Sequence, residues 1–345
     1  MTKREGNGLR RELVLRVFHN EPAERVPVGF WFHFLKDELE DAFDKNGVVD
    51  PQILNTNLAG HEKFYRAFQP DFLKIMTDGF FIYPNETFTR AKRAADLREV
   101  KPIGADHPWI RRQIEFAKTM TAKYGAEVLC FYNIFAPATY FKFCRHDFPG
   151  SPDRALADFI EEDREAVIHA LGVVAEDIAA LARGVIAEGG ADGIYFSVQD
   201  LADQWANAAL HRDCIAPSDI AVLEGANAAA QLNILHICGY EGHRNDLSHY
   251  TSYPAQIINW AVAVDGVSLG VGKKLFGGKP VIGGFDNMVK GVLYRGGRDA
   301  IEAETDRLLK EAGTVGVALG ADCTVPRDID LGHLAWVRDR AAACH

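Results

Sequence analysis

The stretch SPDRALADFIEEDREAVIHALGVVAEDIAALARGVIAEGGADGIYFSV, residues 151–198, indicates the architecture because it joins a long helical pattern directly to a buried strand. The helical part begins with Ser-Pro-Asp, which suits a helix N-terminus, and it ends in glycine at position 189. Its length predicts two helices in series. The strand part, 192–198, lacks strict alternation of apolar and polar residues, as expected for a parallel strand that is buried on both faces.

The same order of apolar run and helical pattern recurs along the chain. The strand candidates are 26–32, 71–77, 126–133, 192–198, 233–238, 256–262, 279–285 and 316–321. Alternating strands and helices predict a parallel α/β sheet with right-handed crossovers, and eight such units predict a closed (β/α)8 TIM barrel. A doubly wound sheet is the alternative if the strand count is wrong by one or two. We expect one domain, residues 1–345, with an N-terminal helical extension over about residues 1–25.

Composition excludes several classes of protein. Hydrophobic residues make up 48% of the 345 residues, which is enough for a large core. Lys and Arg total 38 against 48 Asp and Glu, so the net charge of −10 argues against a nucleic-acid partner. We expect no membrane partner, because no apolar run reaches the roughly 18 residues of a membrane span.

The cysteines and the N-terminus bear on the compartment. The chain has six cysteines, scattered over its length, and this spacing is not that of a disulfide framework. The N-terminal MTKREGNGLRREL is charged and has no apolar signal core. These features predict reduced thiols and a cytoplasmic protein. A homodimer is compatible with the sequence.

The segment NILHIC, 233–238, places two metal-type ligands at the end of a predicted strand. Side chains alternate along a strand, so His236 and Cys238 point the same way. Cys323 follows the last predicted strand, and in a barrel both strand ends lie on the rim that carries the active site. One His and two Cys suit zinc and leave a fourth position open, as in catalytic sites. The alternative interpretation is that these cysteines pack in the core.

Seven segments carry a family resemblance. They are RVPVGFW (25–31), KIMTDGFFIYP (74–84), NIFAPATY (133–140), GADGIYFS (190–197), LHICG (235–239), VIGGFDN (281–287) and GADCTVP (320–326). In this order they resemble the uroporphyrinogen decarboxylase superfamily over about residues 10–340. The superfamily is built on a (β/α)8 barrel, so the resemblance implies the same fold.

The resemblance is closest to the zinc-dependent methyltransferase branch that works with corrinoids, such as methylcobamide:coenzyme M methyltransferases. That branch has an H-x-C…C zinc motif, which His236, Cys238 and Cys323 match. It implies zinc as cofactor, a corrinoid protein that carries methylcobamide as partner, and a small thiol or methylated substrate. A zinc-bound thiol would be presented as thiolate, with His236 and Cys238 as catalytic residues. In the reverse direction, zinc would polarise a methoxyl oxygen.

The resemblance also implies candidates around the metal. Trp31, His33 and Tyr140 are candidates to contact the methylcobamide, with Phe32, Phe80 and Phe81 as further residues of an apolar rim. Carboxylates usually orient a ligating histidine, and Asp78 could serve in this way. The sequence does not choose a fourth zinc ligand among Asp200, Glu241 and Asp322.

Two other functions stay open. A cofactor-independent decarboxylase of uroporphyrinogen or a related aromatic acid would use Asp78, which stands where that branch has its catalytic Asp, and Tyr140 matches a tyrosine of the same branch. However, GFWFHFLKD (29–37) replaces the Arg-containing motif that holds substrate carboxylates there. The non-enzyme alternative is a corrinoid- or tetrapyrrole-binding module with a structural zinc.

Overall fold

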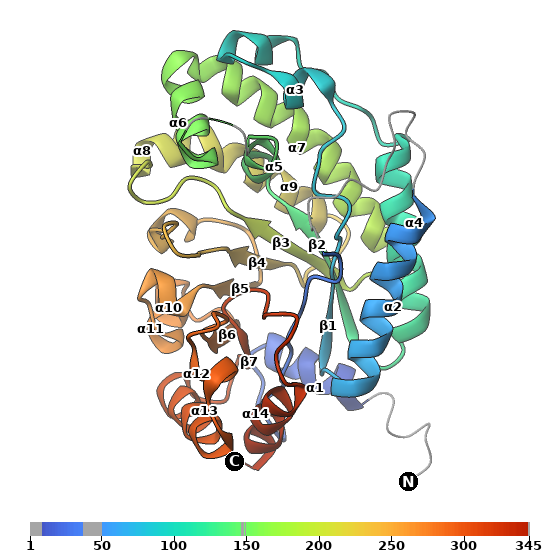
Figure 1. The fold of residues 1–345 in the computed structure, drawn as a ribbon, viewed down its shortest axis with the longest axis vertical. Coiled ribbons are helices and arrows are strands. Elements are labelled where there is room, and N and C mark those ends of the chain that lie inside the picture. The colour runs from blue at the N-terminus through green and yellow to red at the C-terminus, as the bar shows by residue number, and fades with distance from the viewer. Residues whose placement is uncertain (1–8, 37–49, 146–147, 149, 344–345) are drawn as a thin grey trace.

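The structure, a computed structural model, describes residues 9–36, 50–145, 148 and 150–343. Its centre is one curled parallel sheet in which neighbouring strands follow chain order from β1 to β7 (Figure 1). The strands are β1 (Phe72–Ile75), β2 (Leu129–Phe135), β3 (Gly193–Val198), β4 (Ile234–Ile237), β5 (Ile257–Trp260), β6 (Val281–Phe285) and β7 (Val317–Ala321). The fold is therefore α/β and TIM-barrel-like.

The prediction of eight strands is wrong by one in the described part of the chain. Segment 26–32 lies where an eighth strand would close the barrel, but it forms only a single parallel bridge, from Val28 to Leu319 of β7. Pro27 has no N–H to offer, and the Val28 N–H donates to the Asp71 carboxylate at 2.8 Å instead of to a strand. On the β1 side one backbone bond remains, from Asp71 N–H to the Val28 carbonyl at 3.0 Å.

Helices surround the sheet (Figure 1). They are α1 (Leu9–Phe18), α2 (Pro51–Phe68), α3 (Glu86–Arg90), α4 (Pro108–Tyr124), α5 (Pro137–Phe143), α6 (Pro152–Glu162), α7 (Arg164–Ala187), α8 (Ala208–Leu210), α9 (Ala216–Asn227), α10 (Val262–Asp265), α11 (Leu269–Leu275), α12 (Val292–Arg295), α13 (Arg298–Ala312) and α14 (Leu331–Ala343), with the 3₁₀ turns η1 (Ala94–Glu99) and η3 (Leu247–Tyr250) and the π-turn η2 (His211–Ile215). No helix of the described residues is both long and apolar enough to cross a membrane.

The prediction of two helices in series within 151–189 is confirmed by α6 and α7. The Ser151 hydroxyl caps α6 by accepting the Arg154 N–H at 3.1 Å, and Pro152 occupies the first turn. The break falls at Asp163, whose carboxylate accepts the Ala166 N–H at 3.2 Å and so starts α7. A side chain that bonds to the backbone is thus what divides the helical pattern.

Helix α1 fills the space inside the sheet at the N-terminal ends of the strands. Its Phe18 ring lies 6.1 Å from that of Phe72 on β1 and 5.9 Å from that of Phe131 on β2. Apolar side chains from every strand join this inner cluster: Phe72, Leu129, Phe131, Tyr195, Ile234, Ile257, Ile282 and Ala318. The interior is therefore packed and apolar at one end, which leaves only the C-terminal end of the strands open for polar side chains.

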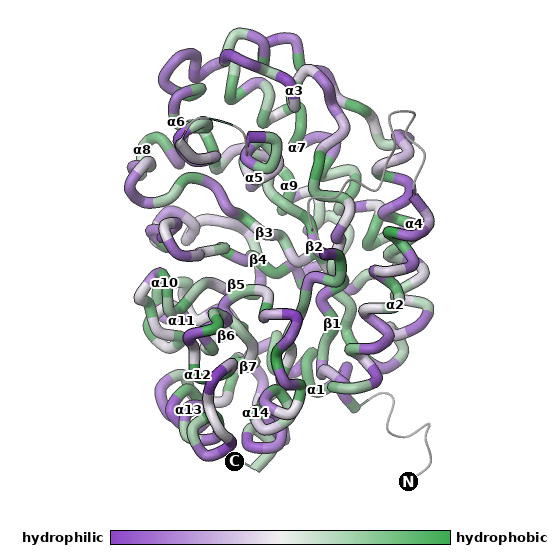
Figure 2. The backbone as a smooth tube through the Cα atoms, in the orientation of Figure 1, coloured by the Kyte–Doolittle hydropathy of each residue, from purple (hydrophilic) through white to green (hydrophobic). Residues whose placement is uncertain are grey.

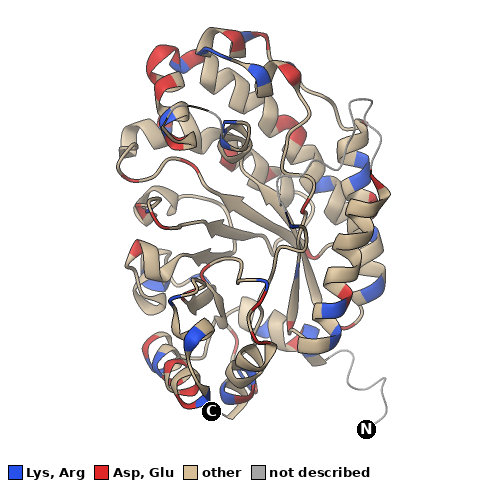
Figure 3. Cartoon of the chain, in the orientation of Figure 1, with Lys and Arg blue, Asp and Glu red and all other residues tan. Residues whose placement is uncertain are grey.

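The central strands and the surrounding helices also differ in polarity. The tube is mainly hydrophobic or neutral along the central strands and mixed along the surrounding helices (Figure 2). Charged residues gather on the surrounding helices, and the strands are nearly free of them (Figure 3). A charged side chain on a strand of this sheet is therefore an exception that requires a physical reason.

Candidate metal centre

A cavity of about 290 Å³ opens at the C-terminal ends of the strands. Its walls come from the strand ends and the loops after them: His33, Lys74, Met76, Phe81, Asn133, Phe135, Phe143, Ser197, Gln199, His236, Cys238, Gly239, Tyr240, Asn287, Cys323 and Thr324. This is the end of a parallel barrel at which ligands bind. The cavity contains all three residues of the predicted metal motif.

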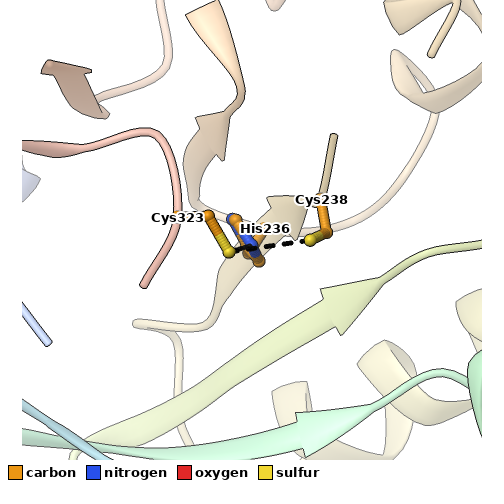
Figure 4. Close-up of side chains that lie close together, drawn as sticks. All are labelled: His236, Cys238 and Cys323. Carbon is orange, nitrogen blue, oxygen red and sulfur yellow. Dashed lines mark hydrogen bonds between the residues drawn. The ribbon is translucent and has the colours of Figure 1, made fainter. Parts of the chain in front are cut away.

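The three predicted ligands converge although one of them is far away in sequence (Figure 4). The Cys238 and Cys323 sulfurs lie 3.7 Å apart, and the Cys323 sulfur lies 3.5 Å from His236 Nε2. All three ligand atoms are within 4.8 Å of one another. His236 lies on β4, Cys238 directly after it, and Cys323 after β7.

These distances fit a tetrahedral metal ion. Zinc at its ordinary bond lengths separates two thiolate sulfurs by about 3.8 Å and a sulfur from an imidazole nitrogen by about 3.6 Å. The distance between the Cys238 and Cys323 sulfurs and that between the Cys323 sulfur and His236 Nε2 match these values, and the third pair of ligand atoms lies within 4.8 Å. Two cysteines and one histidine are a donor set that suits zinc, and three protein ligands leave one position for a substrate.

The register of two strands orients the histidine. His236 on β4 pairs with Asn259 on β5, which places the Asn259 Oδ1 against His236 Nδ1 in a short hydrogen bond. The Asn259 amide donates to the Ile282 carbonyl at 2.8 Å, so its oxygen faces the imidazole. His236 Nδ1 therefore donates, and Nε2 keeps its lone pair toward the sulfurs.

Two neighbouring residues, Tyr195 and Gly283, help to fix the position of the Asn259 side chain. The Tyr195 hydroxyl donates to the same Oδ1 at 2.9 Å. Gly283 has φ +131°, and a Cβ on it would come within 2.9 Å of the Asn259 amide nitrogen. Glycine at this position therefore permits both a strained backbone and the close approach of the side chain that holds the ligand.

The two thiols differ in proton affinity. Hydrogen bonding to Cys238 lowers the pKa of Cys323 well below its ordinary value, with help from the nearby His236 and Lys74, although burial acts in the opposite direction. The pKa of Cys238 is raised by the same shared hydrogen and by burial. The thiolate form is thus favoured at Cys323, and a thiolate is the form that binds a metal. The Gln199 amide, 3.6 Å from the Cys238 sulfur, donates to it.

Asp78 lies behind the cavity wall and positions His33. One carboxylate oxygen lies 2.8 Å from His33 Nδ1, and the other accepts the N–H groups of Phe34 at 2.5 Å and Leu35 at 3.2 Å. Burial alone would raise the pKa of Asp78, but these hydrogen bonds outweigh it and lower the pKa. Asp78 is not a lining residue of the cavity, whereas His33 is.

The other predicted residues are distributed between core and rim. Trp31 lies in the apolar cluster inside the sheet, 5.3 Å from the Tyr195 ring, and Tyr140 packs against Trp109 and Phe135. Neither lines the cavity. Of the predicted rim phenylalanines, Phe81 lines the cavity, and Phe32 and Phe80 belong to the outer core.

The structure does not bring the suggested fourth ligands to the cluster within the described residues. The Asp200 carboxylate accepts the Tyr250 hydroxyl at 3.1 Å, and that of Asp322 accepts the Ala263 N–H at 2.7 Å. Burial raises the pKa of Asp322 well above its ordinary value. Glu241 is exposed.

Sequence reasoning missed Lys74 and Asn259. Lys74 and Asn259 each interrupt an apolar strand run, in FLKIM and IINWA. A polar residue inside a buried strand needs a partner or a function, so this interruption was the available signal.

Comparisons with known proteins place the chain in a family. The model of the family described as "Uroporphyrinogen decarboxylase (URO-D)" matches residues 82–343. No curated protein matches the chain significantly.

Solved structures share the fold at low sequence identity. A methyltransferase from Methanosarcina mazei has a TM-score of 0.67 and 16% identity, over 97% of this chain and 98% of that one. A B12-independent methionine synthase from Shewanella sp. W3-18-1, in complex with selenomethionine, has a TM-score of 0.52 and 14% identity, over 92% and 97%. A putative vitamin-B12 independent methionine synthase from Listeria monocytogenes has a TM-score of 0.54 and 13% identity, over 92% and 98%. The family match covers most of the chain, and the chain therefore belongs to the uroporphyrinogen decarboxylase family.

Proposed function

We propose that the protein is a zinc-dependent methyltransferase that moves a methyl group between a corrinoid protein and a small substrate, either a thiol or a methoxyl compound. The observation that carries the proposal is the convergence of His236, Cys238 and Cys323, whose ligand atoms lie within 4.8 Å of one another, with two of the three distances at tetrahedral spacing. The Methanosarcina mazei methyltransferase, which has the same fold, supports the reaction class.

The metal and the chain have separate tasks. Bound zinc would act as a Lewis acid that favours the thiolate form of a thiol or polarises a methoxyl oxygen. Asn259 holds the His236 ring so that its lone pair faces the site. Gln199 donates to the Cys238 sulfur and so restrains one thiolate.

His33 is suited to move the proton in this reaction. Its Nδ1 is held by Asp78, and its Nε2 makes no hydrogen bond within the described part of the chain. The ring lines the same cavity as the ligand cluster. His33 Nε2 would therefore accept the proton that a thiol gives up, or return one to a methoxyl oxygen as its methyl group leaves.

Part of the cavity wall is aromatic. The Phe81 ring lies 4.6 Å from that of Phe135 and 5.4 Å from that of Phe143, and Phe135 and Phe143 are 4.9 Å apart. Such a wall excludes water from a reacting methyl group and offers a flat ring a surface on which to stack. These properties support a methylcobamide, presented by a partner protein, as the other substrate.

The alternative, a decarboxylase that uses Asp78, has less support from the geometry. Both oxygens of Asp78 are engaged in holding His33 and the backbone that follows it. A substrate with many carboxylates needs several cations, and Lys74 is the one lysine or arginine among the described residues that line the cavity.

The test is the zinc content of the purified protein together with methyl transfer from free methylcobalamin to 2-mercaptoethanol. We expect about one zinc per chain in the wild type, as for a three-ligand catalytic site, and loss of zinc in Cys238→Ala and Cys323→Ala. The transfer rate, read from cobalamin absorbance, should fall in both variants.

Cys214→Ala is the matched control, because Cys214 is a free buried cysteine in η2 that does not line the cavity. It should keep both zinc and activity. A folded wild-type protein without zinc, or zinc retained in both ligand variants, would overturn the proposal.

A further inference from the structure

Lys74 is a charged residue on a buried strand, and it points into the cavity. It occupies the third position of β1, in which all residues are buried. Phe72 and Met76, two positions to either side, belong to the apolar cluster inside the sheet. Because side chains alternate along a strand, Lys74 faces the interior too, and it forms part of the cavity wall together with the three metal-type ligands.

The Lys74 ammonium has no hydrogen-bond acceptor in the described part of the chain, although the residue is only 4% exposed. Its recorded contacts are with ring faces, at 4.1 Å from the Tyr195 centroid and 5.2 Å from that of Trp31. Ring faces attract a cation but do not replace the hydrogen bonds of three N–H groups. Burial lowers the pKa of Lys74 to about 8, and the nearby Cys323, Cys238 and Asp78 oppose this shift.

Apart from the two thiols, the polar groups that line the cavity do not compensate this cation. The Ser197 hydroxyl donates to Asn133 Oδ1 at 3.0 Å, and the Asn133 amide donates to Thr77 Oγ1 at 3.2 Å, so these neutral groups satisfy one another. No aspartate or glutamate is among the described lining residues. An anion that enters would therefore meet Lys74 without breaking an ion pair.

We propose that the cavity binds a small carboxylate, whose anionic group pairs with Lys74 while the reacting sulfur or oxygen lies at the His236, Cys238 and Cys323 cluster. The aromatic wall of Phe81, Phe135 and Phe143 would contact the apolar body of the molecule. The cavity volume restricts the substrate to a small molecule. The placement of the reacting sulfur or oxygen at the metal ligands rests on the proposed function, whereas the pairing of the carboxylate with Lys74 does not.

The experiment measures calorimetric binding of three probes to the purified protein. The probes are 3-mercaptopropionate, its neutral amide 3-mercaptopropionamide, and propionate, which has no thiol. We expect the wild type to bind the carboxylate thiol about 10- to 100-fold more tightly than the amide, as for a hydrogen bond to a charged group. In Lys74→Met the two thiols should bind alike, with the affinity for the amide unchanged.

Two further variants isolate the charge. Lys74→Gln keeps a polar side chain of similar length and gives the same test if the methionine variant does not fold. Lys118→Met removes a lysine that is exposed on α4 and should leave both affinities unchanged. Equal affinity of the wild type for acid and amide would overturn the proposal. An equal loss for both thiols in Lys74→Met would overturn it too, since Lys74 would then act only as a counter-charge to the sulfurs.

The metal-free variant Cys323→Ala separates this inference from the proposed function. If the site binds carboxylates as inferred, propionate binds Cys323→Ala and the wild type alike, and Lys74→Met abolishes this binding. That result with a zinc-free wild type would remove the proposed function and leave the carboxylate site. If the wild type contains zinc and transfers methyl groups but Lys74→Met does not weaken propionate binding, the proposed function stands and the carboxylate site is overturned.

Discussion

Two buried lysines in this protein have opposite surroundings. The Lys142 ammonium, on α5, bonds to Asp153 at 3.0 Å and to the carbonyls of Gln199 at 2.9 Å and Asp200 at 2.8 Å. The Lys74 ammonium, on β1, faces a cavity and two aromatic rings. Burial lowers the pKa of both, but of the two only Lys142 has hydrogen-bond acceptors within the described residues.

The difference separates a structural cation from one that is available to a ligand. Asp153 also accepts the Ala202 N–H at 3.2 Å and contacts His243 at 3.2 Å, so the Lys142 pair ties α5 and α6 to the loops after β3 and β4. The loop after β3 begins with Gln199, and the loop after β4 begins with Cys238. The Lys142 cluster therefore supports the site from behind, and the Lys142 ammonium itself has three hydrogen-bond acceptors.

The largest effect should come from breaking the compensated pair. Asp153→Ala leaves the Lys142 charge buried without its counter-charge, and we expect a loss of about 3–5 kcal/mol in the free energy of unfolding. Urea denaturation followed by circular dichroism measures this loss. A change below about 1 kcal/mol would mean that the pair is not what holds these loops, contrary to the comparison.

At the proposed metal site the sensitive position is Asn259, which orients His236. Asn259→Ala removes the acceptor of His236 Nδ1, and we expect zinc affinity to fall about 10- to 100-fold. Competition with a chromogenic chelator gives the affinity. Asn259→Asp keeps an oxygen toward the imidazole and should recover most of it; if this variant binds zinc as weakly as the alanine variant, Asn259 acts through packing alone.

The compensated pair should also produce a pH dependence of stability. Burial would raise the pKa of Asp153, but His243 and Lys142 outweigh it and lower the pKa to about 2, against 3.8 in the unfolded chain. A lowered pKa stabilises the fold above pH 3.8, and this contribution of about 2 kcal/mol is lost as the pH falls toward 2.

Urea titrations between pH 6 and pH 2 check this sign. The wild type should lose about 2 kcal/mol more than Asp153→Asn over this range. Parallel curves for the two proteins would show that the carboxylate has the same proton affinity in the folded and unfolded chains.

The smallest effect is expected at the uncompensated lysine. Lys74→Met removes a buried cation that has no hydrogen-bond acceptor among the described residues, so the free energy of unfolding should stay within about 1 kcal/mol of the wild type or increase. The exposed Lys118→Met should change it by less than about 0.5 kcal/mol. If Lys74→Met destabilised the protein as much as Asp153→Ala does, Lys74 would be a structural lysine like Lys142, and the comparison would fail.

The sequence predicted the alternation of strands and helices well, because burial on both faces leaves continuous apolar runs that are visible without a structure. Seven of the eight expected strands formed, and the helix pair α6 and α7 lies where Ser151, Pro152 and glycine indicated. The apolar run 26–32 did not reveal that this segment would fail to form a strand, because the Val28 N–H is taken up by the side chain of Asp71, 43 positions away.

The sequence by itself determined the metal ligands as a hypothesis, because alternation along one strand directs His236 and Cys238 to the same side. Only the tertiary structure decided that Cys323 completes the cluster, that Asn259 and not a carboxylate orients the histidine, and that Asp78 is engaged in holding His33. The reason is physical: these contacts depend on strand register and on the curl of the sheet, which join residues that are distant in the chain. Lys74 shows the same division, since its charge is visible in the sequence, whereas its want of a hydrogen-bond acceptor among the described residues is a property of the folded cavity.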